Sequence, residues 1–188
     1  MQASKCVGCK EFPCVGVKHE CYVVPGIDIQ PDEVSIVMIS EAAPADPADY
    51  YYASGEPLFQ QTTVQAFNDT GADVSSIQDI VDLGVYLTTA VKCGKIGYGI
   101  KAGPIKECSL ILEKELALFS NVQVFMLMGD VAIKAINYIA RGPVKQEPFP
   151  PVPRTRSGGK NIFSGGGGLF PPTCRPVPAF SSKRARGE

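Results

Sequence analysis

Two pairs of cysteines constrain the fold of this chain more than any other feature of its sequence. Cys6 and Cys9 form a C-x2-C pair near the start, and Cys93 and Cys108 lie in the middle with fourteen residues between them. A C-x2-C spacing allows two thiolates to reach one metal centre from a tight loop. If all four cysteines meet, they tie the N-terminal segment to the body of the fold. Four thiolates suit either a tetrahedral zinc ion or a [4Fe–4S] cluster.

A local metal site is the alternative arrangement. Cys14 and Cys21 extend the first pair to C-x2-C-x4-C-x6-C, and His19, the only histidine of the chain, lies within this stretch. A zinc knuckle built from these residues closes only short loops and therefore costs less chain entropy. The spacing alone leaves both arrangements open.

Composition predicts one globular domain. Of the 188 residues, 45% are hydrophobic and 20% are charged, as in ordinary globular proteins. No run of eighteen apolar residues predicts a membrane span, and the start lacks the apolar segment of a signal peptide. We therefore expect a cytoplasmic protein whose seven cysteines are metal ligands and buried thiols rather than disulfides.

Charge is unevenly distributed along the chain. The net charge is −1, but residues 151–188 contain seven basic residues and one acidic residue, a local net charge of +6. A basic segment of this kind can contact nucleic-acid phosphates even when the whole chain is close to neutral. It can equally be a solvated tail, and charge alone favours that interpretation.

Strands and helices alternate along the chain. Apolar, β-branched runs predict buried strands at 34–39, 85–91 and 122–128, and a short last strand starting at 169. Helical patterns occur at about 62–69, 75–81, 104–119 and 131–141, with Asp130 as the expected N-cap of the last helix. The alternation predicts an α/β fold, a three-layer α/β/α domain with a central, mainly parallel four-stranded sheet. A cysteine-rich segment (1–24) precedes this core, and a Gly/Pro-rich basic segment (143–188) follows it.

Four stretches of sequence resemble motifs of one enzyme superfamily. IVMISEAAPADPADYYYASGEPLF is similar to a strand followed by G-E-x-P-G and G-x-P-F, and YLTTAVKC to Y-[IL]-T-N-x-x-K-C. ECSLILEKELALF with VFMLMGDVAIKAI matches a cysteine-bearing helix and the strand-Gly-helix after it, and FPPTCRPVP stands in place of T-x-H-P-[SA]. In this order the motifs resemble the uracil-DNA glycosylase superfamily, most closely its iron–sulfur (family four-like) branch.

The resemblance implies a cofactor and a partner. It implies a [4Fe–4S] cluster, with zinc as the alternative, on Cys6, Cys9, Cys93 and Cys108. Cys14 and Cys21 then become structural or spare thiols. It also implies a monomer that acts on single- or double-stranded DNA carrying a damaged base, and that has no membrane partner.

The resemblance assigns site residues position by position. Glu41 matches the motif glutamate, and Arg175 stands where the family has the histidine that contacts the uracil O2, so these two are the catalytic candidates. Thr89 stands where the family has the asparagine that reads the uracil edge. The base-pocket candidates are Ala42, Tyr52, Phe59 and Thr89, and the DNA-binding candidates are Arg175, Lys183, Arg184 and Arg186.

Cleavage of an N-glycosidic bond needs a flipped base, an oriented water and stabilisation of an oxocarbenium-like sugar. A carboxylate at Glu41 can supply charge and hold water. Asp46 and Asp49 are weaker candidates, because acids in a proline-rich loop more often cap turns.

Two functions remain open because Thr89 and Arg175 replace the asparagine and histidine of the family. The first is a DNA glycosylase that hydrolyses the bond to uracil or another damaged base. The second is a non-catalytic nucleic-acid-binding iron–sulfur protein on the same fold. A more remote interpretation is a zinc module attached to an unrelated α/β domain.

Overall fold

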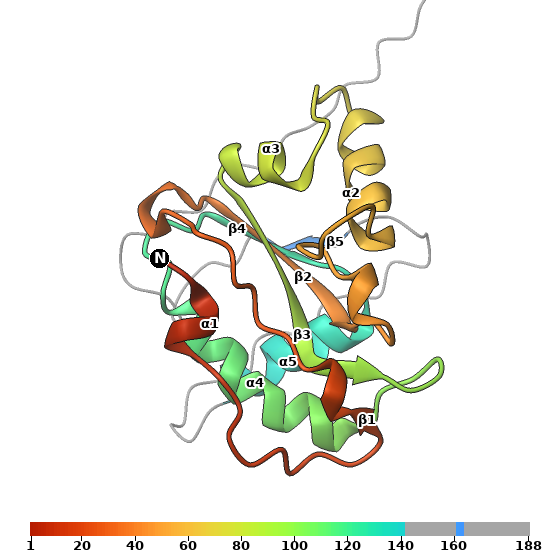
Figure 1. The fold of residues 1–188 in the computed structure, drawn as a ribbon. Coiled ribbons are helices and arrows are strands. Elements are labelled where there is room, and N and C mark those ends of the chain that lie inside the picture. The colour runs from red at the N-terminus through yellow and green to blue at the C-terminus, as the bar shows by residue number, and fades with distance from the viewer. Residues whose placement is uncertain (142–160, 164–188) are drawn as a thin grey trace, which may run out of the picture.

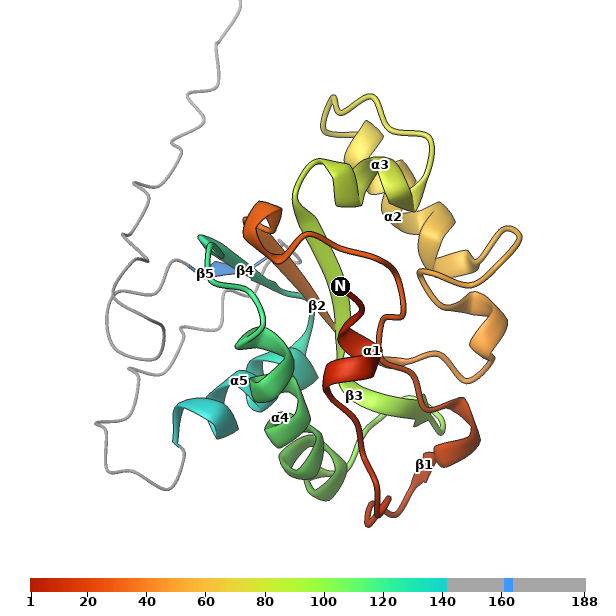
Figure 2. The same cartoon turned by 60° about the vertical axis from the view of Figure 1, so that its left-hand side comes forward.

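The computed structural model describes residues 1–141 and 161–163, which form a sheet with helices on both faces (Figures 1 and 2). The strand order is β1-β3-β2-β4-β5. The three central strands are parallel, and the short strands at the two edges are antiparallel to their neighbours. The strands are β1 (Val17–Lys18), β2 (Ile36–Ala43), β3 (Val85–Lys95), β4 (Val124–Leu127) and β5 (Asn161–Phe163). The predicted three-layer α/β architecture is therefore confirmed.

The strands differ from the prediction at their ends and in their number. β2 and β3 continue to Ala43 and Lys95, several residues beyond the predicted ends. The two edge strands were not predicted, since two or three residues carry no periodic pattern. The strand predicted to start at residue 169 lies outside the described residues.

Helices cover both faces of the sheet. The helices are α1 (Ala3–Cys6), α2 (Leu58–Asn68), α3 (Ile77–Asp82), α4 (Ala102–Leu116) and α5 (Asp130–Ala140), with short 3-10 turns at His19–Cys21, Pro31–Glu33 and Pro47–Asp49. α2 and α3 lie on one side of the sheet, and α4 and α5 lie on the other (Figure 2). No helix in the described ranges is both long enough and apolar enough to span a bilayer.

One predicted helix cap is wrong. Asp130 is the first residue of α5 rather than its N-cap, and its side chain is exposed. Gly129 holds the N-cap position with a φ of 105° and offers no capping side chain. The entry to α5 therefore depends on a glycine conformation, and the acidic residue that suggested a cap comes one position too late.

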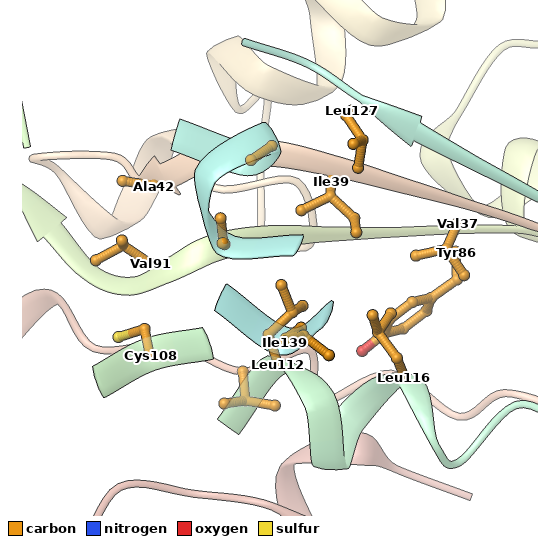
Figure 3. Packing of buried hydrophobic residues seen from close by; sticks show 14 of the residues in the cluster. Val37, Ile39, Ala42, Tyr86, Val91, Cys108, Leu112, Leu116, Leu127 and Ile139 are labelled. Carbon is orange, nitrogen blue, oxygen red and sulfur yellow. The ribbon is translucent and has the colours of Figure 1, made fainter. Parts of the chain in front are cut away.

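The larger of the two hydrophobic clusters lies between the sheet and the α4–α5 layer. Figure 3 shows Val37 and Ile39 of β2 pointing toward the helical layer that carries Leu112 and Leu116. The next residue along β2 after Val37, Met38, belongs to the second cluster on the opposite face, with residues of α3. This alternation fixes which side of β2 each residue faces.

A buried polar network joins β3 to α4. Lys92 forms a fully buried ion pair with Glu115 and also donates to Thr88 Oγ1 over 2.7 Å. Tyr86 Oη and Thr88 Oγ1 both donate to Glu115 Oε1, over 2.7 and 2.8 Å. Burial, followed by the Glu115 charge, raises the pKa of Tyr86 well above its ordinary value. Each charged group thus has several partners, as a buried ion pair requires.

We expect Glu115→Gln to destabilise the fold strongly, because it leaves the Lys92 ammonium buried without an opposite charge. Loss of one partner of a buried pair costs about 3–5 kcal/mol. Urea unfolding measures this loss. The matched control is Glu113→Gln on the exposed face of the same helix, for which a change within about 0.5 kcal/mol is expected. Equal stability of the two variants would show that the pair does not hold β3 and α4 together.

Candidate functional site

The carboxyl ends of β2 and β4 form a crevice at which the chain changes direction. The chain leaves β2 toward α2 on one face of the sheet and leaves β4 toward α5 on the other. Open α/β sheets bind their ligands at such a switch point. A cavity of about 880 Å³ lies here. Its wall includes Ser40, Glu41 and Ala42 from β2, Phe59 from α2, and Met128 and Gly129 after β4.

Glu41 lies directly against the backbone of Gly129. A Cβ placed on Gly129 would come within 2.5 Å of Glu41 Oε1 and 2.9 Å of its Cγ and Cδ atoms. With a φ of 105°, this position is also one that residues with side chains rarely adopt. The Glu41 carboxyl therefore packs on the start of α5, where the free N–H groups of the helix carry partial positive charge.

A register shift in the sheet lies next to Glu41. β2 and β3 pair regularly up to Ala42 and Val91, but the next pair joins Ala43 to Gly94. Such irregularities often accompany functional sites, because they redirect side chains at the end of a strand. The extra length of β3 also brings Lys95 to the cavity wall. The sequence analysis missed Lys95 because its glycine-rich surroundings predicted a loop.

Two of the predicted base-pocket residues, Ala42 and Phe59, line the cavity, and the other two do not. Thr89 is fully buried beside Ser40 in the sheet register, and its Oγ1 has no hydrogen-bond partner within the described part of the chain.

Tyr52 closes the open edge of β3. Its hydroxyl accepts from Leu87 N and donates to Leu87 O, both over 3.1 Å. This contact satisfies two backbone groups that no neighbouring strand reaches. Burial raises the pKa of Tyr52 far above its ordinary value. Its role here is therefore structural.

Tyr51, not Tyr52, lines the cavity. Its ring packs edge-on against Phe59 with 5.2 Å between ring centroids, and burial raises the pKa of its hydroxyl. Ser40 and Tyr51 were not in the predicted base pocket, although Tyr51 precedes Tyr52 and Ser40 precedes Glu41 in the sequence. Asp46 caps the adjacent 3-10 turn through its bond from Ala48 N, at 2.9 Å, as expected for an acid in this loop.

The predicted site residues of the C-terminal segment, Arg175, Lys183, Arg184 and Arg186, lie outside the described residues. Within the described part of the chain, the wall of the cavity comes from positions 36–129.

The cysteines separate into two groups. Cys93 and Cys108 are buried at the junction of β3 and α4, and Figure 3 shows Cys108 on the same helical layer as Leu112. The N-terminal segment packs against this junction through Cys14. Cys6 is exposed, and its sulfur donates to Gln2 O over 3.6 Å.

The predicted local knuckle is not assembled either. Cys21 is buried beneath Gly94, and its sulfur donates to Ala45 O over 3.3 Å. Cys6 is exposed as well, so two of the four cysteines of the knuckle do not face a common site. In residues 1–141, no three cysteine, histidine or acidic side chains converge closely enough to hold a single metal ion.

The charges of Cys9, Cys14, Cys93 and Cys108 nevertheless affect the pKa values within this set. Burial, followed by the charges of nearby cysteines, raises the pKa of Cys14 to about 11 and that of Cys93 to about 12. Burial also raises the pKa of Cys108, to which the charge of Cys9 adds. These thiols are therefore neutral at ordinary pH, and a bound cation would reverse that preference.

No protein-family model matches this chain, and no curated protein matches it either. Its function must therefore be argued from the geometry of the site and from the sequence motifs.

We expect the contact between Glu41 and Gly129 to appear in a double-mutant cycle. Gly129→Ala should cost at least about 1–3 kcal/mol, since it combines an unfavourable φ with a collision. Glu41→Ala removes the side chain with which the new methyl collides. The double variant should therefore be more stable than the sum of the single changes, by about 0.5–3 kcal/mol.

Gly71→Ala is the matched control for this cycle. Gly71 also has a positive φ, 91°, but no atom lies within 4 Å of a Cβ placed there. Its cost should be independent of Glu41 in urea unfolding. Additive effects of Gly129→Ala and Glu41→Ala would show that the two residues are not in contact.

Proposed function

We propose that this protein binds DNA and hydrolyses the N-glycosidic bond of a uracil or other damaged base flipped into the cavity that α2 forms with strands β2 and β4. The observation that carries the proposal is the position of Glu41, which lies on the cavity wall at the switch point of the sheet. The motif that contains Glu41 resembles the first active-site motif of uracil-DNA glycosylases. Motif and geometry thus support the same residue independently.

The cavity suits a nucleoside in size and character. Its volume of about 880 Å³ lies within the usual range for small-molecule sites, about 300–1,000 Å³. Phe59 and Tyr51 provide aromatic surface for a flipped base, and Met38, Met126 and Met128 make much of the remaining wall apolar. Stacking on such a surface offsets part of the stacking energy that a flipped base loses when it leaves the duplex.

Glu41 would act on the sugar rather than on the base. As the bond to the base breaks, positive charge develops on the sugar, and a carboxylate at its side stabilises that charge. The same carboxylate can orient the attacking water. In this proposal Arg175 stabilises the departing anionic base, because a guanidinium keeps its charge at any working pH.

Base selection would differ from that of enzymes with an asparagine in the pocket. The described wall contains no asparagine, glutamine or histidine, and the Thr89 hydroxyl is buried behind it. A pocket without such a bidentate group rejects analogues weakly. We therefore propose a broad or altered preference among damaged bases.

The same observation favours a second candidate function. A wall without a base-reading amide also fits a protein that binds nucleic acid on this fold without cutting it. Retention of Glu41 at the switch point favours the enzyme, whereas the buried Thr89 favours the binding protein.

The proposal includes an iron–sulfur cofactor, with zinc as the alternative. Two of the four cysteines that the resemblance implies, Cys93 and Cys108, are buried where β3 meets α4. Burial raises the pKa of both thiols, and the charge of Cys9 adds to this. Cys6 does not fit this group, since it is exposed and bonded elsewhere. A cluster at this junction would hold the N-terminal segment on the fold and would take no part in bond cleavage.

We expect Glu41→Gln to lower the rate of base release by about 10²–10³, because it removes a charge from the developing sugar cation while keeping the shape. DNA affinity should change little. Release should be measured as alkali-induced strand cleavage of oligonucleotides containing uracil, hypoxanthine, xanthine or an oxidised base. Glu113→Gln, on the far face of α4, is the control. A wild type that binds every oligonucleotide and releases no base would favour the binding protein.

We expect removal of residues 183–188 to weaken DNA binding, since it deletes Lys183, Arg184 and Arg186. Each lost phosphate contact should reduce the slope of log affinity against log salt by about 0.9 on duplex DNA. Fluorescence anisotropy at several salt concentrations measures both effects. A full-length variant with glutamine at the three positions should behave like the truncation. Unchanged affinity and slope would place the DNA-binding surface elsewhere.

A further inference from the structure

We propose that Cys14, rather than Cys6, completes a four-cysteine site with Cys9, Cys93 and Cys108, and that this site binds an iron–sulfur cluster. The inference deepens the cofactor part of the proposed function and does not depend on base release. It departs from the C-x2-C pairing that the spacing of the sequence favoured.

Cys14 packs against the hydrophobic cluster that contains Cys93 and Cys108. The backbone oxygen of Cys14 lies 2.8 Å from Nε2 of His19, whose Nδ1 lies 3.9 Å from the sulfur of Cys93. His19 thereby connects the Cys14 loop to β3.

A strained turn positions Cys9. Phe12 N donates to Cys9 Sγ over 3.3 Å, and Cys9 N donates to the hydroxyl of Tyr22 over 2.8 Å. Phe12 has a φ of 47°, the only positive value for a non-glycine residue in the described ranges. A bulky residue adopts this conformation only where its surroundings require it, and such strain is concentrated at functional sites.

Aromatic contacts hold the turn in place. The Phe12 ring packs edge-on against His19 and Tyr22, with 5.4 and 5.0 Å between ring centroids. These contacts fix the turn between Cys9 and Cys14, and the N–H directed at the Cys9 sulfur is the kind of bond that stabilises metal-bound thiolates.

Burial separates Cys14 from Cys6. Cys14 is half-buried against the core that contains Cys93 and Cys108, whereas Cys6 is exposed and its sulfur donates to Gln2 O over 3.6 Å. Four thiols gathered in this way repel one another as thiolates, unless a cationic centre lies between them.

A single zinc ion and a cluster require different spacings of the four sulfurs. Zinc bound by four sulfurs at about 2.3 Å requires the sulfurs to be within about 3.8 Å of one another. No three ligand side chains in the described residues form a group that could hold a single metal ion. A four-iron cluster attaches each thiolate to a different iron and therefore holds the sulfurs farther apart.

Lys92 lies close to the candidate cysteines. Burial raises the pKa of Cys108, and Lys92 acts in the opposite direction. Hydrogen bonds and positive charge near the sulfurs are the usual means by which a protein stabilises a cluster of net negative charge. The buried pair with Glu115 holds Lys92 in this position.

The experiment compares Cys14→Ser with Cys6→Ser in the full-length protein. Each variant is purified without oxygen, and iron and acid-labile sulfide per chain are measured together with the visible absorbance and its bleaching by dithionite. We expect the wild type and Cys6→Ser to contain equal iron and sulfide, and Cys14→Ser to lose most of both. The opposite ranking would overturn the proposal, as would a wild type that contains zinc or no metal.

A second measurement uses the unmodified wild type, so that a misfolded variant cannot decide the result. Brief alkylation of the native protein followed by mass spectrometry should label Cys6 and leave Cys14 protected until the iron is removed. Equal labelling of both cysteines in the iron-loaded protein would overturn the assignment. An iron-loaded protein with protected Cys14 that releases no base would defeat the glycosylase proposal alone.

Discussion

The buried pair of Lys92 and Glu115 is the interaction on which the rest of this structure depends. It fixes β3 against α4, and these two elements carry the candidate cluster cysteines Cys93 and Cys108. A buried ion pair is a poor source of net stability but a strict determinant of geometry, because a slipped arrangement leaves a charge without a partner. Its function here is to set the register between strand and helix.

Long, strongly periodic elements were predicted correctly from the sequence, and short or irregular ones were not. The apolar run of β3 and the helical spacing of Ile105, Cys108 and Leu112 in α4 are local patterns that packing reinforces. β5 was not predictable, since its three residues are stabilised by pairing with β4 rather than by their own preferences. The same holds for the entry to α5, where the φ of Gly129 replaced the expected cap at Asp130.

The candidate site was predictable only where a single residue carries the chemistry. Glu41 lies on the cavity wall as its motif suggested, but its contact with Gly129 joins positions far apart in the sequence. Tyr52 was predicted as a base-pocket residue because of its aromatic ring, but its hydroxyl instead bonds the open edge of β3. Spacing favoured Cys6 over Cys14, because a C-x2-C pair is a familiar local pattern. The turn at Phe12, which directs Cys9 inward, leaves no such signature.

The two candidate sites share one strand. Within five consecutive residues, β3 carries Thr89, whose backbone pairs with Ser40 of the cavity wall, and Cys93, which faces the cysteine group. The carboxyl end of β3 lies at the edge of the sheet, where the two residues of β1 and the bond from Val23 N to Lys92 O support it. A cluster bound there would hold the N-terminal segment against this edge. Its effect on the cavity would therefore pass through the position of the strand rather than through electron transfer.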